Sequence, residues 1–382
     1  MSDLTLHPST PTTRTATPPH TPDWPVLSLA IIVALAVLGF HLTRHDPARA
    51  GLFLVAVALG WVFMRSDFSY TAAFRNLVAR GNGTMLALAV GLAAIPALVI
   101  IPVTTLTPAY AGYVSPLGLP VIAGAALFGA GMQLANGCAS GSLYAAGAGS
   151  RRLWIAIPFF CAGGVLGSLM LPYAMALPSF PAIGLGQVFG PWVGLALTLA
   201  LILGLAAILL RLPASSAPDA TKLRFAGAIG VLAACAFLLW GSPWGVTMGL
   251  TVWGAKLAGL IGLSVEHTRF WQSPPAAAAL HSNILQQPSS LMNIGVLLGA
   301  MLPAAWRGRF RAWQWPDARG CLAAAIGGLS MGVGARLAFG CNIGSLLGGL
   351  SSGSLHGVLW LGAALAGTWI GIRLRPRFGL SV

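Results

Sequence analysis

Long apolar runs, each about as long as a bilayer is thick, constrain this 382-residue chain more than any other feature. A membrane-spanning helix needs roughly 20 predominantly apolar residues. Ten runs come close to this length: residues 26–42, 49–64, 84–103, 117–135, 154–172, 190–210, 225–241, 289–305, 320–339 and 356–372. Only 7% of all residues are charged, against about 25% in a typical soluble domain. The sequence therefore predicts an all-α polytopic membrane protein with about 9–11 transmembrane helices.

The N-terminal residues 1–24 differ from the remainder in being rich in Pro and Thr. Such a segment cannot bury enough apolar surface to fold, so we expect a disordered tail. The first apolar run begins only near Val26, whereas a secretory signal would start at the N-terminus. We therefore expect a retained transmembrane helix there, and a single transmembrane domain over residues 25–382.

The distribution of basic residues predicts an orientation. The chain carries 21 Lys and Arg against seven acidic residues. Basic residues precede the third and fifth runs and recur at 211–224, 307–319 and 373–377, whereas 104–116 and 173–189 are uncharged. The positive-inside rule places the basic loops and the N-terminal tail in the cytoplasm, with Arg44 and Arg49 as exceptions on the other side. Because the basic residues are scattered over short loops beside the lipid bilayer, nucleic-acid binding is not expected.

Two stretches of the chain repeat each other at a distance of 203 residues. "FGAGMQLANGCASGSL" (128–143) matches "MGVGARLAFGCNIGSL" (331–346) at nine of 16 positions, including Cys138/Cys341 and Gly137/Gly340. The predicted orientation makes these two units antiparallel, which is typical of transporters built as inverted repeats with a binding site at the repeat interface. We expect the pseudo-repeats to cover about 49–210 and 225–375.

Short Gly-rich pieces at about 139–149, 244–262 and 342–353 are predicted to be half-helices or re-entrant segments. Two of them follow directly after Cys138 and Cys341. A helix that begins inside the membrane presents unpaired N–H groups and its positive dipole end, which favour an anion. Glycine before each cysteine lets a ligand approach the backbone, and a thiol is a polarisable hydrogen-bond group suited to sulfur. Cys138, Cys341, Gly137 and Gly340 are therefore candidate binding residues.

Two basic residues lie unusually deep in apolar sequence. Arg336 precedes Cys341 by five residues, and Lys256 lies within "WGVTMGLTVWGAKLAGLIG". An intramembrane charge marks a candidate functional site, so we expect both to guide an anion, although each could instead extend to the interface. The remaining cysteines, 161, 235 and 321, have no repeated context and are expected to be packing residues. No cysteine has a metal-ligand spacing, and neither a cofactor nor a metal is expected.

These motifs resemble the YeeE/YedE sulfur-transport family from about residue 50 to the C-terminus. The resemblance rests on "FGAGMQLANGCASGSL", "SPWGVTMGLTVWGAKLAG" and "LSMGVGARLAFGCNIGSL". It implies an hourglass-shaped bacterial inner-membrane permease for thiosulfate or a related reduced-sulfur anion. In that family the anion is thought to pass between cysteines by transient S–H···S hydrogen bonds, and Cys138 and Cys341 match the two central cysteines. A small cytoplasmic sulfur-carrier protein is an implied partner.

One position departs from the family pattern. "RSDFSYTAAFRN" (65–76) is similar to a family segment with a further cysteine, and Ser69 stands at that position. A hydroxyl still donates a hydrogen bond to an anion, so Ser69 is a weaker candidate, and other sulfur or selenium species become possible substrates.

Two alternatives to a permease remain open at this stage. A membrane thiol–disulfide oxidoreductase would need a reactive cysteine pair, which Cys138 and Cys341 form only if they meet in space. A membrane adaptor that hands sulfur or selenium to a soluble carrier would use a docking surface such as 307–319. Because no Walker A motif, Rossmann fingerprint or nucleophile elbow occurs, we expect a non-enzymatic protein.

Overall fold

The computed structural model describes residues 21–66, 68–310 and 315–381 and consists almost entirely of helices. In this part of the chain, ten helical segments are long and apolar enough to cross a membrane. They span Trp24–Thr43, Pro47–Arg80, Thr84–Leu106, Leu119–Gly147, Arg151–Ala174, Pro191–Leu210, Ala220–Trp240, Pro288–Trp306, Ala318–Ser351 and His356–Phe378. The prediction of an all-α polytopic membrane protein is confirmed.

Several of these segments are divided into separate helices. In chain order the helices are α1 (Trp24–Thr43), α2 (Pro47–Ser66), α3 (Tyr70–Arg80), α4 (Thr84–Gly91), α5 (Ala94–Leu106), α6 (Leu119–Ala135), α7 (Ala139–Gly147), α8 (Arg151–Ala174), α9 (Leu185–Phe189), α10 (Pro191–Leu210) and α11 (Ala220–Trp240). There follow α12 (Val246–Leu260), α13 (Pro274–His281), α14 (Pro288–Trp306), α15 (Ala318–Leu337), the π-helix η1 (Asn342–Gly348), α16 (Gly349–Ser351), α17 (His356–Leu374) and the 3₁₀ turn η2 (Arg375–Phe378). Two short antiparallel strands, β1 (Leu117–Gly118) and β2 (Ser179–Phe180), pair with each other.

The three short segments predicted from the sequence are helices too short to cross a bilayer. They are α7 with 9 residues, α12 with 15, and the 7-residue η1 continued by α16. At 1.5 Å per residue, α7 extends only about 13 Å. Both cysteine units therefore consist of a long helix, a break, and a short helix.

The predicted tail, residues 1–24, lies mostly outside the part of the chain that the structure describes. Residues 1–20 lie outside the described residues. Asp23 is buried; its N–H donates to the carbonyl of Ala305 at 2.8 Å, and its carboxylate accepts from the N–H of Phe310 at 3.0 Å. These contacts attach the start of α1, which begins at Trp24, to the end of α14.

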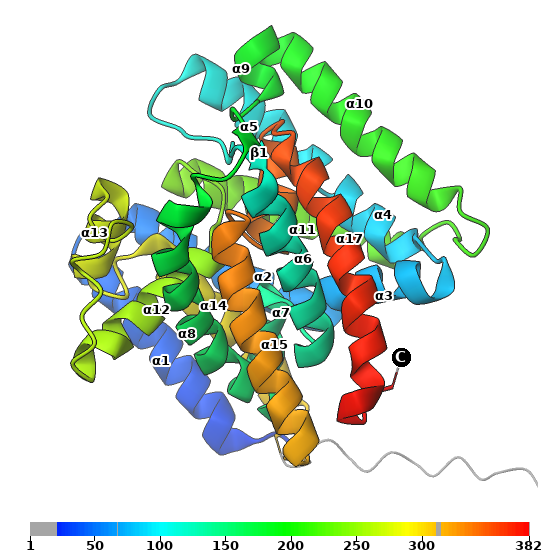
Figure 1. The fold of residues 1–382 in the computed structure, drawn as a ribbon. Coiled ribbons are helices and arrows are strands. Elements are labelled where there is room, and N and C mark those ends of the chain that lie inside the picture. Colours follow the sequence, from blue (N-terminus) through cyan, green and yellow to red (C-terminus); the bar gives the residue numbers. More distant parts are fainter. Residues whose placement is uncertain (1–20, 67, 311–314, 382) are drawn as a thin grey trace, which may run out of the picture.

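The long helices of the two cysteine units pack against each other in opposite directions. Figure 1 shows α8, α15, α6 and α17 side by side, with α15 in orange next to α6 in teal. A Cβ placed on Gly131 would lie 2.8 Å from the carbonyl oxygen of Gly327, and one on Gly334 would lie 2.5 Å from that of Gly124. Since 131 is opposite 327 and 124 is opposite 334, α6 and α15 run antiparallel. Small residues allow such close approach in membranes.

Helices α8 and α17 lie at the two ends of this set of four helices, and an equivalent pair of glycine contacts holds them to α15 and α6. A Cβ on Gly129 of α6 would lie 2.2 Å from the carbonyl oxygen of Ala364 in α17. A Cβ on Gly332 of α15, the matching residue of the other unit, would lie 2.3 Å from that of Phe160 in α8. The long helix of the first unit, α6, therefore packs against α17, which follows the second unit. The long helix of the second unit, α15, packs against α8, which follows the first unit.

The basic exceptions to the predicted orientation have local partners. Arg49 forms an ion pair with Asp46 and donates from Nε to the carbonyl of Gln286 at 2.9 Å. The guanidinium of Arg44 lies 4.5 Å from the centre of the Phe40 ring. Because Asp46 neutralises Arg49, the loop between α1 and α2 has less net positive charge than its arginines alone indicate.

Candidate functional site

The breaks before the two cysteines are made by the residues that precede the glycines. Asn136 and Phe339 occupy matching positions of the repeat and have φ of 63° and 59°, in the left-handed region. That conformation ends α6 and α15. It is tolerated by Asn and is unusual for a bulky residue such as Phe. Gly137 and Gly340, which follow these two residues, do not have a positive φ.

Gly137 and Gly340 instead provide space. A Cβ on Gly340 would lie 2.7 Å from Oγ and 2.8 Å from the backbone nitrogen of Ser345. A Cβ on Gly137 would lie 2.9 Å from Cδ2 of Leu153. The second break therefore has no room for a side chain before the cysteine, whereas at the first break the nearest atoms belong to the flexible end of Leu153.

The breaks are fixed by hydrogen bonds to their carbonyl groups. Around the second break, Ser345 Oγ donates to the carbonyl of Ala338 at 2.9 Å, Tyr113 donates to that of Phe339, and Trp360 Nε1 to that of Gly340 at 3.2 Å. The two cysteine backbones are therefore held in a defined geometry.

The first break is held by arginines, which the sequence analysis did not single out. Arg152 donates to the carbonyls of Leu134 at 2.6 Å and Ala135 at 3.0 Å, and Arg375 to that of Gln133 at 2.6 Å. Arg75 donates to Oδ1 of Asn136 at 3.0 Å. Cations suit the negative end of the α6 dipole, and a contact between residues so far apart in sequence leaves no local pattern to detect.

Each cysteine occupies the position directly before a short helix. Cys138 is 2% exposed, and its Sγ accepts from the N–H of Gly141 at 3.3 Å and lies 3.6 Å from Ser140 Oγ. Cys341 is 1% exposed and precedes η1. Both are free thiols.

The fold buries the two cysteines in one cluster. Cys138, Cys341 and Tyr70 all belong to the same buried core cluster. Because α6 and α15 pack antiparallel, the two breaks lie at opposite ends of this helix pair, and each break is followed by a short helix, α7 after Cys138 and η1 after Cys341.

Ser69 begins α3 beside this site. Its Oγ accepts a hydrogen bond from the N–H of Ala72 at 3.2 Å, as an N-cap residue does. The hydroxyl of Ser69 therefore has a local structural partner, and the next residue, Tyr70, is the one that belongs to the buried cluster with both cysteines. No sequence pattern distinguishes Tyr70 from the other aromatic residues.

The two deep basic residues lie in different places. Arg336 is partly buried near the end of α15; its guanidinium lies 4.5 Å from the centre of the Phe270 ring, and Nη1 lies 3.7 Å from Sδ of Met248. Among the described residues no carboxylate pairs with it. Lys256 of α12 donates to the carbonyl of Leu280 in α13 at 2.5 Å, and so lies at a separate contact from the cysteine pair.

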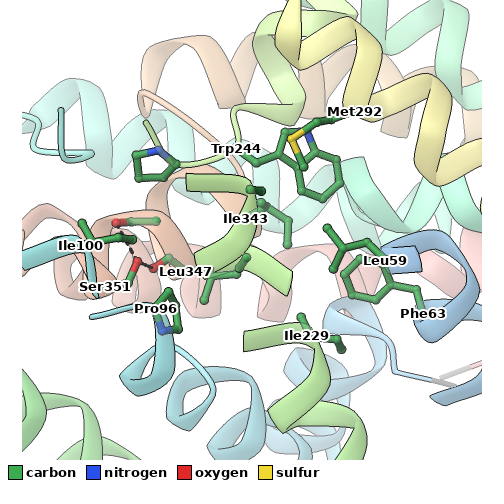
Figure 2. A pocket seen from close by; sticks show the side chains of 14 residues that line it. Leu59, Phe63, Pro96, Ile100, Ile229, Trp244, Met292, Ile343, Leu347 and Ser351 are labelled. Carbon is green, nitrogen blue, oxygen red and sulfur yellow. Dashed lines mark hydrogen bonds between the residues drawn. The ribbon is translucent and has the colours of Figure 1, made fainter. Parts of the chain in front are cut away.

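A cavity of about 30 Å³ lies on the other side of η1. Figure 2 shows its lining, with Ile343 and Leu347 of η1 opposite Leu59 and Phe63 of α2. Ser351 contributes a hydroxyl, which donates to the carbonyl of Leu347 at 2.7 Å. Apolar cavities of this kind do not favour water or an anion, so the polar site is the cysteine region rather than this cavity. In the described part of the chain, no three His, Cys, Asp or Glu side chains gather as metal ligands.

Residues 65–370 match the family model described as "Sulphur transport". The chain belongs to this sulphur transport family. The match includes both cysteine units and the segment that contains Ser69 and Tyr70.

Individual relatives agree with this assignment. The chain is 26% identical to "Thiosulfate transporter TsuA" of Spirochaeta thermophila over 83% of its own length and 96% of the relative's. It is 26% identical to the Escherichia coli protein of the same name over 81% and 90% of the two lengths. It is also 32% identical to "Probable transporter YedE" of Escherichia coli, where the match covers 41% of this chain and only 38% of the relative's length.

Proposed function

We propose that this protein is a bacterial inner-membrane permease for thiosulfate or a closely related reduced-sulfur anion. The observation that carries the proposal is the pair of buried, free thiols of Cys138 and Cys341, each directly before a short helix at the break of one of two antiparallel units. Family membership supports sulfur transport, and the TsuA relatives carry the name of a thiosulfate transporter.

The anion passes between the thiols without a covalent step. Each S–H donates a weak hydrogen bond to the terminal sulfur of the anion, and each bond breaks as the anion moves to the next thiol. Hydrogen bonds of this strength suit conduction, because a permeating ion must leave each site as readily as it enters. The N–H groups at the start of α7 and the positive end of its dipole compensate part of the anion's lost hydration.

Basic residues attract the anion at both ends of this path. Arg336 lies near the second break, without a paired carboxylate among the described residues. Arg75, Arg152 and Arg375 gather at the first break. With the basic loops in the cytoplasm, the second break faces the outside and the first faces the cell interior. Lys256, at its contact with α13, supplies positive charge on the outer side.

A cytoplasmic sulfur carrier is the proposed recipient. It would meet the basic segment 307–319, of which residues 311–314 lie outside the described residues. Ser69 in place of a third cysteine leaves selenium and other sulfur oxyanions as alternative substrates.

The decisive experiment measures uptake of ³⁵S-labelled thiosulfate by cells that depend on this protein. Cys138→Ala and Cys341→Ala should each abolish uptake while the protein still accumulates in the membrane. Cys235→Ala is the matched control, because Cys235 on α11 is partly exposed and lies outside the repeated units. Normal uptake by both variants would rule out the thiol pathway.

The alternative raised by the sequence, a thiol–disulfide oxidoreductase, makes a different prediction for the two thiols. Such an enzyme would cycle Cys138 and Cys341 through a disulfide. Mass spectrometry of the protein during uptake distinguishes the two functions, since the permease keeps both thiols free throughout.

A further inference from the structure

The segment that carries Tyr70 is held firmly against the cysteine site. Tyr144 of α7 donates from its hydroxyl to the carbonyl of Phe68 at 2.7 Å. The Tyr70 ring meets the Phe68 ring edge-on, at 5.0 Å between centres and 89° between planes. Ser69 caps α3 directly before it. The direction of the Tyr70 side chain is therefore fixed by the fold.

The hydroxyl of Tyr70 is buried and has no hydrogen-bond partner within the described part of the chain. The residue is 2% exposed. It belongs to the same buried cluster as Cys138 and Cys341, and the Phe68 segment that it packs on is bound to Tyr144 of α7, the helix that begins directly after Cys138. A buried hydroxyl without a partner is unfavourable, and such groups in native structures are usually satisfied by a ligand, ion or water.

Asn342 is a second buried polar group of this kind. It follows Cys341 directly and is fully buried, and neither Nδ2 nor Oδ1 has a partner among the described residues. The matching residue of the first unit is Ala139, which also begins a short helix after its cysteine. The amide is therefore not needed to form the break.

Tyr70 and Asn342 supply strong hydrogen-bond donors for oxygen atoms, which the two thiols lack. A thiol is a weak donor suited to sulfur, whereas a phenol O–H and an amide NH₂ are strong donors suited to oxygen. Neither the Tyr70 hydroxyl nor the Asn342 amide has a hydrogen-bond partner in the described residues, so no group in this part of the chain competes with an anion for these donors.

We propose that Tyr70 and Asn342 form the oxygen-binding part of the site, donating hydrogen bonds to the oxygen atoms of the anion while Cys138 and Cys341 contact its terminal sulfur. This inference rests on the proposed function and narrows the substrate class to sulfur oxyanions that carry both kinds of atom. Hydrosulfide, which has sulfur but no oxygen, would leave both donors unsatisfied and be rejected, since a site built to hydrogen-bond a group discriminates against analogues that lack it.

The test measures the KM for ³⁵S-thiosulfate uptake in Tyr70→Phe and Asn342→Ala. Each variant should raise KM by roughly tenfold to a hundredfold, as expected for a lost hydrogen bond to a charged ligand. Unlabelled hydrosulfide should compete poorly with thiosulfate in the wild type and more effectively in both variants. Asn342→Ala introduces the residue that the first unit already has, so a folded protein is expected even if Tyr70→Phe accumulates poorly.

Tyr110→Phe is the matched control. It makes the same chemical change at a partly exposed position, where the hydroxyl donates to the carbonyl of Leu238 at 3.2 Å, and its KM should equal that of the wild type. One result is that the wild type takes up thiosulfate while both variants keep the wild-type KM and the wild-type competition by hydrosulfide. That result would overturn the role of Tyr70 and Asn342 but leave the proposed function standing. Absence of thiosulfate uptake by the wild type would instead refute the proposed function, and this inference with it.

Discussion

Replacing Gly340 with alanine tests whether the crowded turn before Cys341 controls the site. The new Cβ would lie 2.7 Å from Ser345 Oγ and 2.8 Å from the Ser345 backbone nitrogen, and the Tyr113 hydroxyl is 3.2 Å away. A backbone nitrogen cannot move aside as a side chain can. Inserting a group into so tight a space costs about 1–3 kcal/mol, and displacing Ser345 from the Ala338 carbonyl costs about 1 kcal/mol more.

The Gly340→Ala substitution also has a stabilising effect, which is smaller than the steric destabilisation. Alanine restricts the unfolded chain and stabilises the folded state by about 0.4–1 kcal/mol where the backbone allows it. Gly340 lacks a positive φ, so this gain applies. We therefore expect Gly340→Ala to destabilise the protein by about 2 kcal/mol and to displace the Cys341 thiol, with a large loss of uptake.

Two other glycines serve as matched controls. In Gly137→Ala the nearest atoms belong to the flexible end of Leu153, at 2.9 and 3.1 Å, so the change should be within about 1 kcal/mol of neutral. A Cβ added to Gly362 in α17 would have nothing within 4 Å, and Gly362→Ala should stabilise the helix by about 0.5–1 kcal/mol. Thermal unfolding in detergent and thiosulfate uptake are measured for all three. If Gly340→Ala unfolds at the same temperature as Gly362→Ala, the steric explanation is refuted.

Three further predictions concern the contacts around the site and the loops. Arg375→Gln should lower thermal stability by about 1–3 kcal/mol, because it removes the buried donor to the Gln133 carbonyl, whereas the exposed Arg377→Gln should have little effect; equal effects would contradict this. Trp360→Phe keeps an aromatic ring but removes the hydrogen bond to the Gly340 carbonyl. The free energy of unfolding should fall by about 1 kcal/mol in the same assay, with a partial loss of uptake. Wild-type stability and uptake would show that this bond does not hold the turn. Burial raises the pKa of the Asp46 carboxyl, but hydrogen bonds from the backbone and guanidinium of Arg49 outweigh this and hold that pKa below its usual value, so the stabilisation is present at neutral pH and is lost as pH falls through the folded pKa. Asp46→Asn should accordingly be less stable than wild type by under about 1 kcal/mol at neutral pH, and the difference should shrink as the solution is acidified; a difference independent of pH would refute this linkage.

The large features of this fold are encoded in local composition and could be predicted from it. Apolar runs give the crossing helices, because length and hydropathy decide what a bilayer accepts. The repeated Gly-Cys units predict the broken helices and their antiparallel relation, since charge in the loops fixes direction. The structure confirms the helices long enough to cross a membrane and the antiparallel relation of the two broken helices.

The details of the site were less predictable because they depend on contacts between distant residues. The left-handed residue at the second break is Phe339, a type that gives no sequence signal for that conformation, and crowding by Ser345 is what requires Gly340. Tyr70 lies near the cysteines because the segment before α3 is bound to α7, through the hydrogen bond from the Tyr144 hydroxyl to the Phe68 carbonyl. Lys256 is separated from them because α13 folds back to offer the carbonyl of Leu280.

The crossed glycine contacts also determine the order in which the protein can be completed during synthesis. Gly332 of α15 seats against Phe160 of α8, and Gly129 of α6 against Ala364 of α17. When the ribosome has made the first half, the glycine faces of α6 and α8 lack the partners described here, since these lie in α12, α15 and α17 of the second half. The first half therefore has no finished interior of its own, and it must wait in the membrane with an open helix surface until the second half is inserted. Severing the chain between α11 and α14 should yield fragments that mature only when both are produced in the same cell.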